Sequence, residues 1–279
     1  MLMNIFVTLD RNYLAPLRVM LVSLFSNNEA GPIDLWLAGD GLSTDDACGI
    51  ERLCRRFGHT LHMVSVPEEA FSDAPIIRYY TRAMYYRLLA AQLLPDSLDK
   101  ALYLDPDILV INSLHSLYGL DLGNRLFAAA THDGLIGVST KVARIRLSTP
   151  DGEAYFNSGV LLMNLKKMRE AIHPQDIFQY AYERRASLIL PDQDILNGMF
   201  WNHIMRIDEM HWNYDARKYN TYLIASQNEA TLDWVMQNTA ILHFCGKSKP
   251  WKARYRGKFS ALYKHYMVIA DRLMAASDA

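Results

Sequence analysis

The sequence predicts an α/β fold in which helices cover the faces of a mainly parallel sheet. Short apolar runs alternate with longer segments of helical periodicity, which is the pattern of strands linked by crossover helices. The opening run at residues 4–9 is too apolar for a strand with one face in water and suits a buried parallel strand. The chain has 279 residues, 51% of them hydrophobic, and no internal repeat, so it can bury the core of one large domain.

The first hundred residues contain three predicted strands and three predicted helices. The strands are 4–9, 33–38 and 61–66, and the helices run over 14–25, from 43 onward and over 81–94. The first helix carries an apolar stripe of leucines at positions 14, 17, 21 and 24. The second begins at Ser43, a good N-cap residue, and turns Ile50, Leu53, Cys54 and Phe57 inward.

The middle of the chain adds further strands, and the part after residue 165 is mainly helical. The predicted strands are 100–104, 108–111, 126–131, 159–163 and 241–244, and residues 132–154 are expected to form a polar surface loop. In a sheet that opens with alternating strands and helices, ligands bind beyond the carboxyl ends of the strands. We therefore expect functional polar side chains directly after strands.

Composition excludes several classes of protein. The formal net charge is -1, from 29 basic and 30 acidic residues, so a nucleic-acid partner is not expected. No stretch approaches the roughly 20 apolar residues of a membrane-crossing helix, and no secretion signal is recognisable. Three cysteines without a CxxC pair predict reduced thiols and a cytoplasmic location. The absence of glycine-rich dinucleotide and P-loop signatures argues against NAD and P-loop nucleotide binding.

The strongest single motif is Asp105-Pro106-Asp107, which directly follows a predicted buried strand. In an extended segment, side chains two residues apart point the same way, so both carboxylates can bind one divalent cation. Pro106 stiffens the pair by fixing its own φ. A bound cation would also remove the repulsion between the two like charges. A simple turn after a strand explains the same residues equally well.

A second cluster runs from His243 to Trp251, directly after the last predicted strand. Histidine is a ligand for softer divalent ions, and Gly246 and Lys249 suit a loop that faces phosphate. Two carboxylates combined with an imidazole favour Mn²⁺ over Ca²⁺. Taken singly, the histidine and the lysines have ordinary structural or surface roles as alternatives.

Three weaker motifs complete the set of candidate residues. They are Asp10, Asn12 and Tyr13; Asn157 and Ser158; and Asp192 and Gln193. The first follows the opening strand, where many doubly wound sheets hold a base and ribose. The second offers amide and hydroxyl groups that can bind sugar hydroxyls, with a turn as the alternative. The third can place a carboxylate and an amide in a pocket, or be only a helix N-terminus with Asp in its first turn.

In this order the motifs resemble glycosyltransferase family 8, which includes bacterial lipopolysaccharide galactosyl- and glucosyltransferases. The resemblance extends over residues 4–251 and adds Arg87, in Tyr86-Arg87-Leu88. It implies a GT-A fold, which is a Rossmann-like fold of nucleotide-diphospho-sugar transferases, with a catalytic domain at 1–246 and a basic aromatic extension at 247–279. It also implies a retaining enzyme that moves galactose or glucose from a UDP-sugar to a glycan or glycolipid acceptor.

The resemblance assigns a role to each motif. Mn²⁺, with Mg²⁺ as the alternative, would bind Asp105, Asp107 and His243. Uridine and ribose would contact Thr8, Asp10, Asn12 and Tyr13, and the diphosphate would contact Gly246 and Lys249. The transferred hexose would lie among Arg87, Asn157, Asp192 and Gln193, and Pro106 and Ser158 complete the donor-binding set.

The chemistry of the site favours one retaining mechanism over another. A double displacement needs a carboxylate close to the anomeric carbon, but the matching position is Gln193, whose amide is a poor nucleophile. We therefore expect front-face attack by the acceptor hydroxyl, with Asp192 and Gln193 as the catalytic residues and Asp192 orienting the sugar. In the alternative mechanism, Asp192 is the nucleophile. The choice between galactose and glucose stays open because they differ at one hydroxyl. Nucleotide-sugar binding without turnover and glycogenin-like self-glucosylation are alternative functions.

Basic residues are concentrated near the C-terminus. Residues 247–267 hold seven Lys or Arg and no acidic residue, which leaves 22 basic and 30 acidic residues elsewhere. Five apolar side chains there fall near one helical face: Tyr255, Phe259, Leu262, Tyr263 and Tyr266. Such a helix suits peripheral contact with anionic lipid at the inner face of the cytoplasmic membrane. In the alternative, the aromatic residues pack on the core and the charges face water.

The segment 73–80 is a candidate wall or lid for the acceptor. It contains Tyr79 and Tyr80, whose rings can stack on a sugar or simply pack against the protein. Both roles are kept as alternatives.

Overall fold

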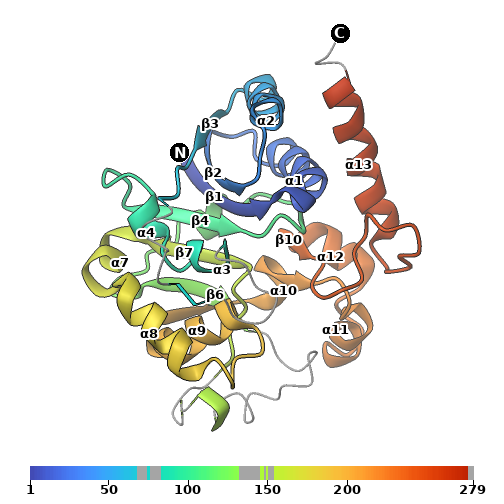
Figure 1. The fold of residues 1–279 in the computed structure, drawn as a ribbon. Coiled ribbons are helices and arrows are strands. Elements are labelled where there is room, and N and C mark those ends of the chain that lie inside the picture. Colours follow the sequence, from blue (N-terminus) through green and yellow to red (C-terminus); the bar gives the residue numbers. More distant parts are fainter. Residues whose placement is uncertain (68–73, 76–82, 132–144, 148, 150–153, 276–279) are drawn as a thin grey trace.

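A seven-stranded mixed sheet forms the centre of the molecule (Figure 1). The computed structural model describes residues 1–67, 74–75, 83–131, 145–147, 149 and 154–275. The strand order is β3-β2-β1-β4-β7-β6-β8. The strands are β1 (Met3–Asp10), β2 (Ile33–Asp40), β3 (Thr60–Met63), β4 (Lys100–Leu104), β6 (Phe127–Ala130), β7 (Val160–Asn164) and β8 (Ile204–Ile207). All pairs are parallel except those of β7, which runs antiparallel to both β4 and β6.

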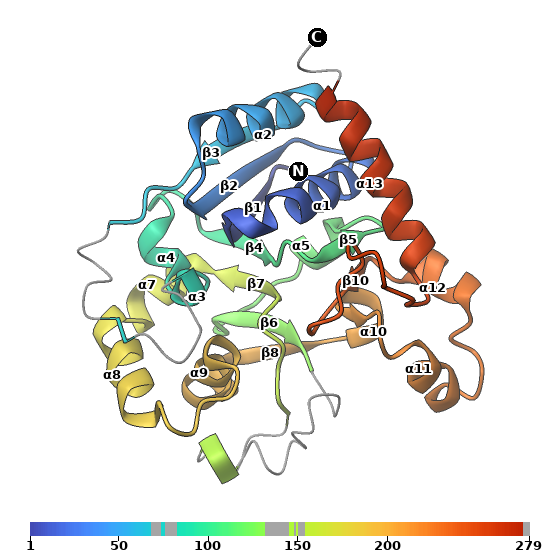
Figure 2. The same ribbon diagram turned by 45° about the vertical axis from the view of Figure 1, so that its right-hand side comes forward.

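Two apolar cores lie on opposite faces of this sheet, because alternate side chains of each strand point to opposite sides. In β1, Ile5 and Val7 belong to one core and Phe6 to the other. The first core is covered by α1 (Leu14–Ser26), α2 (Thr44–Arg56) and α13 (Ser260–Ala275). The second is covered by α3 (Ala83–Tyr86), α4 (Ala90–Leu93), α7 (Leu165–Ala171), α8 (Pro174–Arg184) and α9 (Pro191–Phe200). Figures 1 and 2 show the two groups of helices on the two sides of the sheet.

A small second sheet joins the middle of the chain to its last third. Its order is β5 (Ile108–Val110), β10 (Ile241–His243) and β9 (Tyr214–Asp215), with β10 antiparallel to β5 and parallel to β9. Short helices surround it: α5 (His115–Tyr118), α10 (Glu209–Trp212), α11 (Tyr219–Ala225) and α12 (Leu232–Asn238). This sheet brings the segment after β10 beside the segment after β4.

The predicted strands are confirmed, with small differences at their ends. Strand β3 ends at Met63 rather than at residue 66, and the short strands β8 and β9 were not predicted. The start of α2 is confirmed in detail, since Ser43 and Asp46 form a capping box.

The single helix predicted over 81–94 is wrong in its continuity. The structure has two short helices, α3 and α4, separated by a turn at residues 87–89. Arg87 lies in this turn and forms ion pairs with Asp105 and Asp192. Tertiary contacts of this kind override helical propensity, which is a weak local preference.

The C-terminal segment packs onto the main body. Tyr255, Phe259 and Tyr263 are buried in the first core, and α13 lies along α1 (Figure 2). Leu262 and Tyr266 pack against the same core, and the Tyr266 hydroxyl accepts a hydrogen bond from Asn27 Nδ2 at 2.9 Å. The aromatic face therefore follows the core-packing alternative and is not free to enter lipid. The boundary at residue 246 stays a prediction.

In the part of the chain that the structure describes, no helix is both long enough and apolar enough to cross a membrane. The candidate acceptor wall at 73–80, apart from residues 74–75, and most of the loop at 132–154 lie outside the described residues.

Candidate active site

The end of β4 meets the beginning of β7 because these strands are antiparallel. Leu104 pairs with Val160, and the Asp105 N–H donates to the Gly159 carbonyl at 2.8 Å. Gly159 leaves no room for a side chain, since a Cβ there would lie 2.4 Å from His243 Cε1 and 2.5 Å from Asp105 Oδ2. The missing side chain is what lets the carboxylate and the imidazole approach each other.

The pairing of β5 with β10 brings the two strongest motifs together. His243 pairs with Ile108, and the Phe244 N–H donates to the Asp107 carbonyl at 3.0 Å. His243 Nε2 lies 3.3 Å from Asp107 Oδ1 and 3.8 Å from Asp105 Oδ2. One ligand atom from each of these three residues lies within 4.8 Å of the others, so the predicted metal-ligand group is present as a geometric cluster.

The spacing and chemistry of this cluster fit a divalent cation. Neighbouring ligands of an octahedral ion with bonds of about 2.1 Å lie about 3 Å apart. His243 Nε2 lies 3.3 and 3.8 Å from the two carboxylates, so a small contraction would bring the ligands to that spacing. Two carboxylates and one imidazole suit a first-row transition metal better than Ca²⁺. The residues present therefore fit such an ion.

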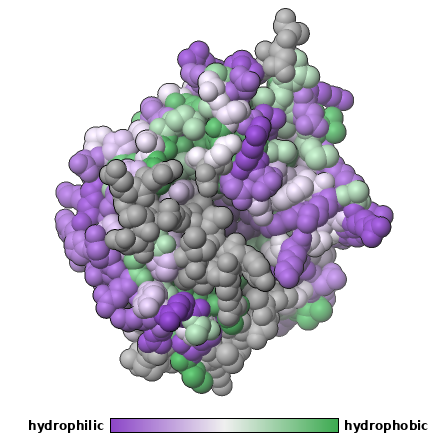
Figure 3. Space-filling model, viewed as in Figure 1, coloured by the Kyte–Doolittle hydropathy of each residue, from purple (hydrophilic) through white to green (hydrophobic). Residues whose placement is uncertain are grey.

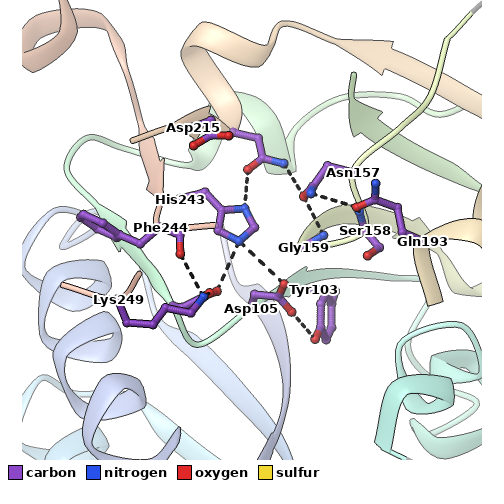
Figure 4. Close-up of polar contacts among 12 residues, drawn as sticks. Tyr103, Asp105, Asn157, Ser158, Gly159, Gln193, Asp215, His243, Phe244 and Lys249 are labelled. Atoms are coloured by element: carbon purple, nitrogen blue, oxygen red, sulfur yellow. Dashed lines mark hydrogen bonds and ion pairs between the residues drawn. The ribbon is translucent and has the colours of Figure 1, made fainter. Parts of the chain in front are cut away.

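Asn213, which the sequence did not single out, orients the histidine ligand. His243 Nδ1 and Asn213 Oδ1 are 2.8 Å apart, and Asn213 Nδ2 donates to Asn157 Oδ1 at 2.9 Å. Because the Asn213 oxygen can only accept, Nδ1 carries a proton. A neutral His243 therefore has its lone pair on Nε2, toward the carboxylates. Figure 4 shows this chain of side chains running from the imidazole to Asn157 and Gln193.

Two cations balance the carboxylates, the buried Lys249 and the half-buried Arg87. Lys249 Nζ donates to Asp107 Oδ2, and also to the Phe244 carbonyl at 3.0 Å. Burial by itself raises the pKa of Asp107, but His243 and Lys249 outweigh it and hold that pKa well below its usual value. Arg87 lies 3.1 Å from Asp105 Oδ1 and 3.0 Å from Asp192 Oδ2.

Tyr103 and Thr8 form a chain of hydrogen bonds that ends at the Asp105 carboxylate. The Tyr103 hydroxyl donates to Asp105 Oδ1 at 2.7 Å and lies 3.1 Å from Thr8 Oγ1. Burial raises the pKa of Tyr103 well above its ordinary value, so the hydroxyl keeps its proton. Arg87 stacks over the same ring, with Cζ 4.7 Å from the centroid. The sequence placed Tyr103 inside a strand and gave no sign of this role.

The residues predicted to surround the sugar also come together. Ser158 Oγ donates to Asp192 Oδ2 at 2.8 Å, and Asn157 Nδ2 donates to Gln193 Oε1 at 3.1 Å. Asp192 and Gln193 lie in the first turn of α9, as the helix-start interpretation also expected. Arg87 joins this group to the metal-ligand cluster, because it pairs with both Asp192 and Asp105. Asn157 joins it by a second route, through Asn213 to His243.

A family model described as glycosyl transferase family 8 matches residues 4–254, which is most of the chain. The chain belongs to glycosyltransferase family 8. It is therefore an enzyme of a retaining hexosyltransferase family, and the family, the enzyme class and the α/β GT-A fold expected from the motifs are confirmed.

The chain is similar to a stress protein, a glucosyltransferase and a galactosyltransferase. General stress protein A of Bacillus subtilis is 27% identical over 95% of this chain and 93% of its own length. Lipopolysaccharide 1,2-glucosyltransferase of Escherichia coli K12 is 29% identical over 89% of this chain and 72% of its own length. A crystal structure of the galactosyltransferase LgtC with donor and acceptor sugar analogues is 26% identical, covers 96% of both chains and has a TM-score of 0.79.

Three predicted nucleotide contacts of this glycosyltransferase lie at the carboxyl end of β1. Asp10 Oδ1 accepts a hydrogen bond from the Asn12 N–H at 2.8 Å, and the Tyr13 ring packs edge-on against Trp251. The hydrogen bond builds the turn after β1, and the ring contact packs it against the segment after β10. The nucleotide role of these residues stays a prediction. Gly246 is exposed and has a φ of +80°, which favours glycine.

Asp194 forms a buried anchor that the sequence did not identify. Its carboxylate is fully buried, accepts from the Tyr155 hydroxyl at 2.6 Å and forms a two-bond pair with Arg146 at 2.7 Å. It also accepts from the backbone N–H groups of Ile189 and Leu190. The start of α9, and with it Asp192 and Gln193, is thereby tied to residues before β7.

Proposed function

We propose that this enzyme transfers galactose or glucose, with retention, from a UDP-sugar to a glycan or glycolipid acceptor. The observation that carries the proposal is the cluster of Asp105, Asp107 and His243 beside the buried Lys249, within a family 8 chain. We assign Mn²⁺ to this cluster, with Mg²⁺ as the alternative. When bound, the ion would supply Lewis-acid stabilisation of the negative charge that develops on the leaving diphosphate.

Lys249 adds a fixed positive charge on the side of the cluster where the diphosphate would bind. Burial lowers the pKa of Lys249, but the neighbouring Asp107 carboxylate raises it by more, so the ammonium stays protonated. A charge held in a buried position before the reaction stabilises developing negative charge without reorganisation. Gly246 and Pro106 would complete this part of the donor site.

Arg87, Asn157, Asp192 and Gln193 would hold the hexose. Asp192 Oδ2 already interacts with Ser158 and Arg87, which supports an orienting role more than a nucleophilic one. Asp194 is also a poor candidate nucleophile, because both of its oxygens are engaged and it is fully buried. We therefore favour front-face attack by the acceptor hydroxyl, with a departing phosphate oxygen as its base.

The test is a UDP-release assay with UDP-galactose, UDP-glucose and UDP-N-acetylglucosamine, each with Mn²⁺ or EDTA. We expect release from one of the first two donors, and we expect EDTA to abolish it. Release that ignores both the donor and EDTA would refute the proposal. Mass spectrometry of the enzyme during turnover tests the mechanism, because a glycosyl adduct on Asp192 would establish a double displacement.

A further inference from the structure

A second pocket, separate from the metal-ligand cluster, lies where the segment after β10 passes the beginning of α11. Its volume is about 580 Å³, within the range of small-molecule sites. Four cationic side chains line it, and no acidic residue does. They are Arg217, Arg254, Arg256 and Lys258. In Figure 3, hydrophilic side chains cover the side of the molecule where the segment between β10 and α13 runs in Figure 1.

The charges of this pocket are mostly uncompensated. Arg254, Arg256 and Lys258 are exposed, and none forms an ion pair with an acidic residue in the described part of the chain. Arg217 differs, because its guanidinium donates two hydrogen bonds to the buried Asp215, at 2.9 and 2.7 Å. Three unpaired cations and one fixed guanidinium around a concave surface repel one another, and a bound anion would relieve that repulsion.

An aromatic ring lies among these cations. Lys258 Nζ is 4.6 Å from the centroid of the Tyr219 ring, and that ring packs edge-on against Phe259. Tyr219 is half-buried and lines the pocket, so part of it is accessible to a ligand. Aromatic rings provide an apolar surface for a sugar ring, while the cations suit phosphate oxygens. The pocket thus combines the two surfaces that a phosphorylated saccharide needs.

The pocket shares a loop with the candidate donor site. Ser248 lines the pocket, whereas the next residue, Lys249, pairs with Asp107 in the metal-ligand cluster. Arg217 lies against the same loop, since a Cβ on Gly246 would be 2.4 Å from its Nη1 atom. A molecule bound in the pocket would therefore lie close to the diphosphate side of the active site.

We propose that this pocket binds a phosphate group carried by a saccharide, and that this saccharide is the acceptor. The second part rests on the proposed transferase function, whereas the binding itself does not. The ligand class is a phosphate monoester on a sugar, held by Arg254, Arg256 and Lys258 with its ring against Tyr219.

The experiment compares two double variants that remove equal charge from the same segment. Arg254→Ala/Lys258→Ala removes pocket cations, and Lys252→Ala/Lys264→Ala removes two exposed lysines that do not line the pocket. Glucose 1,6-bisphosphate is titrated into each protein by calorimetry in the presence of EDTA. We expect the pocket variant to bind about tenfold more weakly or worse, because it loses two charge-assisted contacts. The control variant should match the wild type within about twofold.

Equal weakening in both double variants would overturn the proposal, because it would reduce the effect to net charge. No weakening in either would overturn it as well. Vesicles containing phosphatidylglycerol distinguish a lipid source: loss of vesicle binding in the pocket variant, with unchanged glucose 1,6-bisphosphate binding, would assign the pocket to a membrane headgroup instead. Acceptor-independent UDP release should persist in both variants, so failure of this inference is separable from failure of the transferase proposal.

Discussion

The metal-ligand cluster and the C-terminal segment both concentrate charged and aromatic residues, but the fold treats them in opposite ways. Asp107 and His243 of the cluster are buried, as is Lys249 beside them, and Asp107 pairs with both cations. In the C-terminal segment, Tyr263 is fully buried whereas Lys264 beside it is exposed. The metal site buries its charges, whereas residues 252–275 bury aromatic rings and leave every Lys and Arg exposed.

Buried charges and buried rings contribute differently to function and to stability. Buried charges are costly unless they are paired, so a buried carboxylate–imidazole–lysine group is weak evidence for stability and stronger evidence for chemistry. Buried aromatic rings stabilise a fold simply by leaving water. We therefore expect substitutions in the cluster to reduce activity first, and substitutions of the buried rings of α13 to reduce stability first.

Asp107→Asn should have the largest effect. It keeps the size of the side chain but removes a metal-ligand charge, so metal-dependent UDP release should fall by about a thousandfold or more. Steady-state assays across a range of Mn²⁺ concentrations measure this, with the exposed Asp45→Asn as the matched control. If Asp107→Asn kept its Mn²⁺-dependent turnover, the Asp107 carboxylate would not be needed for activity.

Tyr263→Ala should have the next largest effect, and on stability instead. It removes a fully buried ring that packs against Phe244 and Trp251, so the free energy of unfolding should fall by about 3–5 kcal/mol. Urea denaturation measures the change. The fraction that remains folded should keep its apparent affinity for Mn²⁺; a selective loss of that affinity would show that the ring also serves the active site.

Asn213→Leu should have a smaller and more specific effect. It removes the hydrogen bond that fixes the His243 ring, and loss of such a partner typically weakens metal binding by 10–100-fold. The apparent Mn²⁺ affinity should fall by about that amount, and excess Mn²⁺ should restore turnover. If excess metal restores nothing, Asn213 does more than orient the ligand.

Lys264→Ala should have the smallest effect. The side chain is exposed, so unfolding should change by no more than about 0.5 kcal/mol. If the basic face of α13 contacts anionic lipid, as the sequence suggested, binding to phosphatidylglycerol vesicles should weaken by about fivefold. Unchanged vesicle binding would argue against that contact. Truncation after residue 251 is a poorer test, because it would also remove Tyr255, Phe259 and Tyr263 from the core.

Sequence patterns predicted much of this fold because they are local. A run of apolar residues marks β1, an N-cap serine marks the start of α2, and an Asp-Pro-Asp sequence after a strand marks the metal-ligand group. Local patterns failed where distant residues decide the structure. The turn at Arg87 interrupts a helical pattern because that side chain pairs with Asp105 and Asp192.

The sequence by itself determined the family, the order of the motifs and most strands, since these depend on residue type and short-range periodicity. Only the tertiary structure decided how the motifs meet. Antiparallel β7 places Gly159 beside Asp105, and β10 brings Lys249 to Asp107 across 142 positions of the chain. Tertiary packing also decided that the rings of the C-terminal segment face the core. Strand pairing and burial depend on the free energy of the whole folded chain, which no local pattern records.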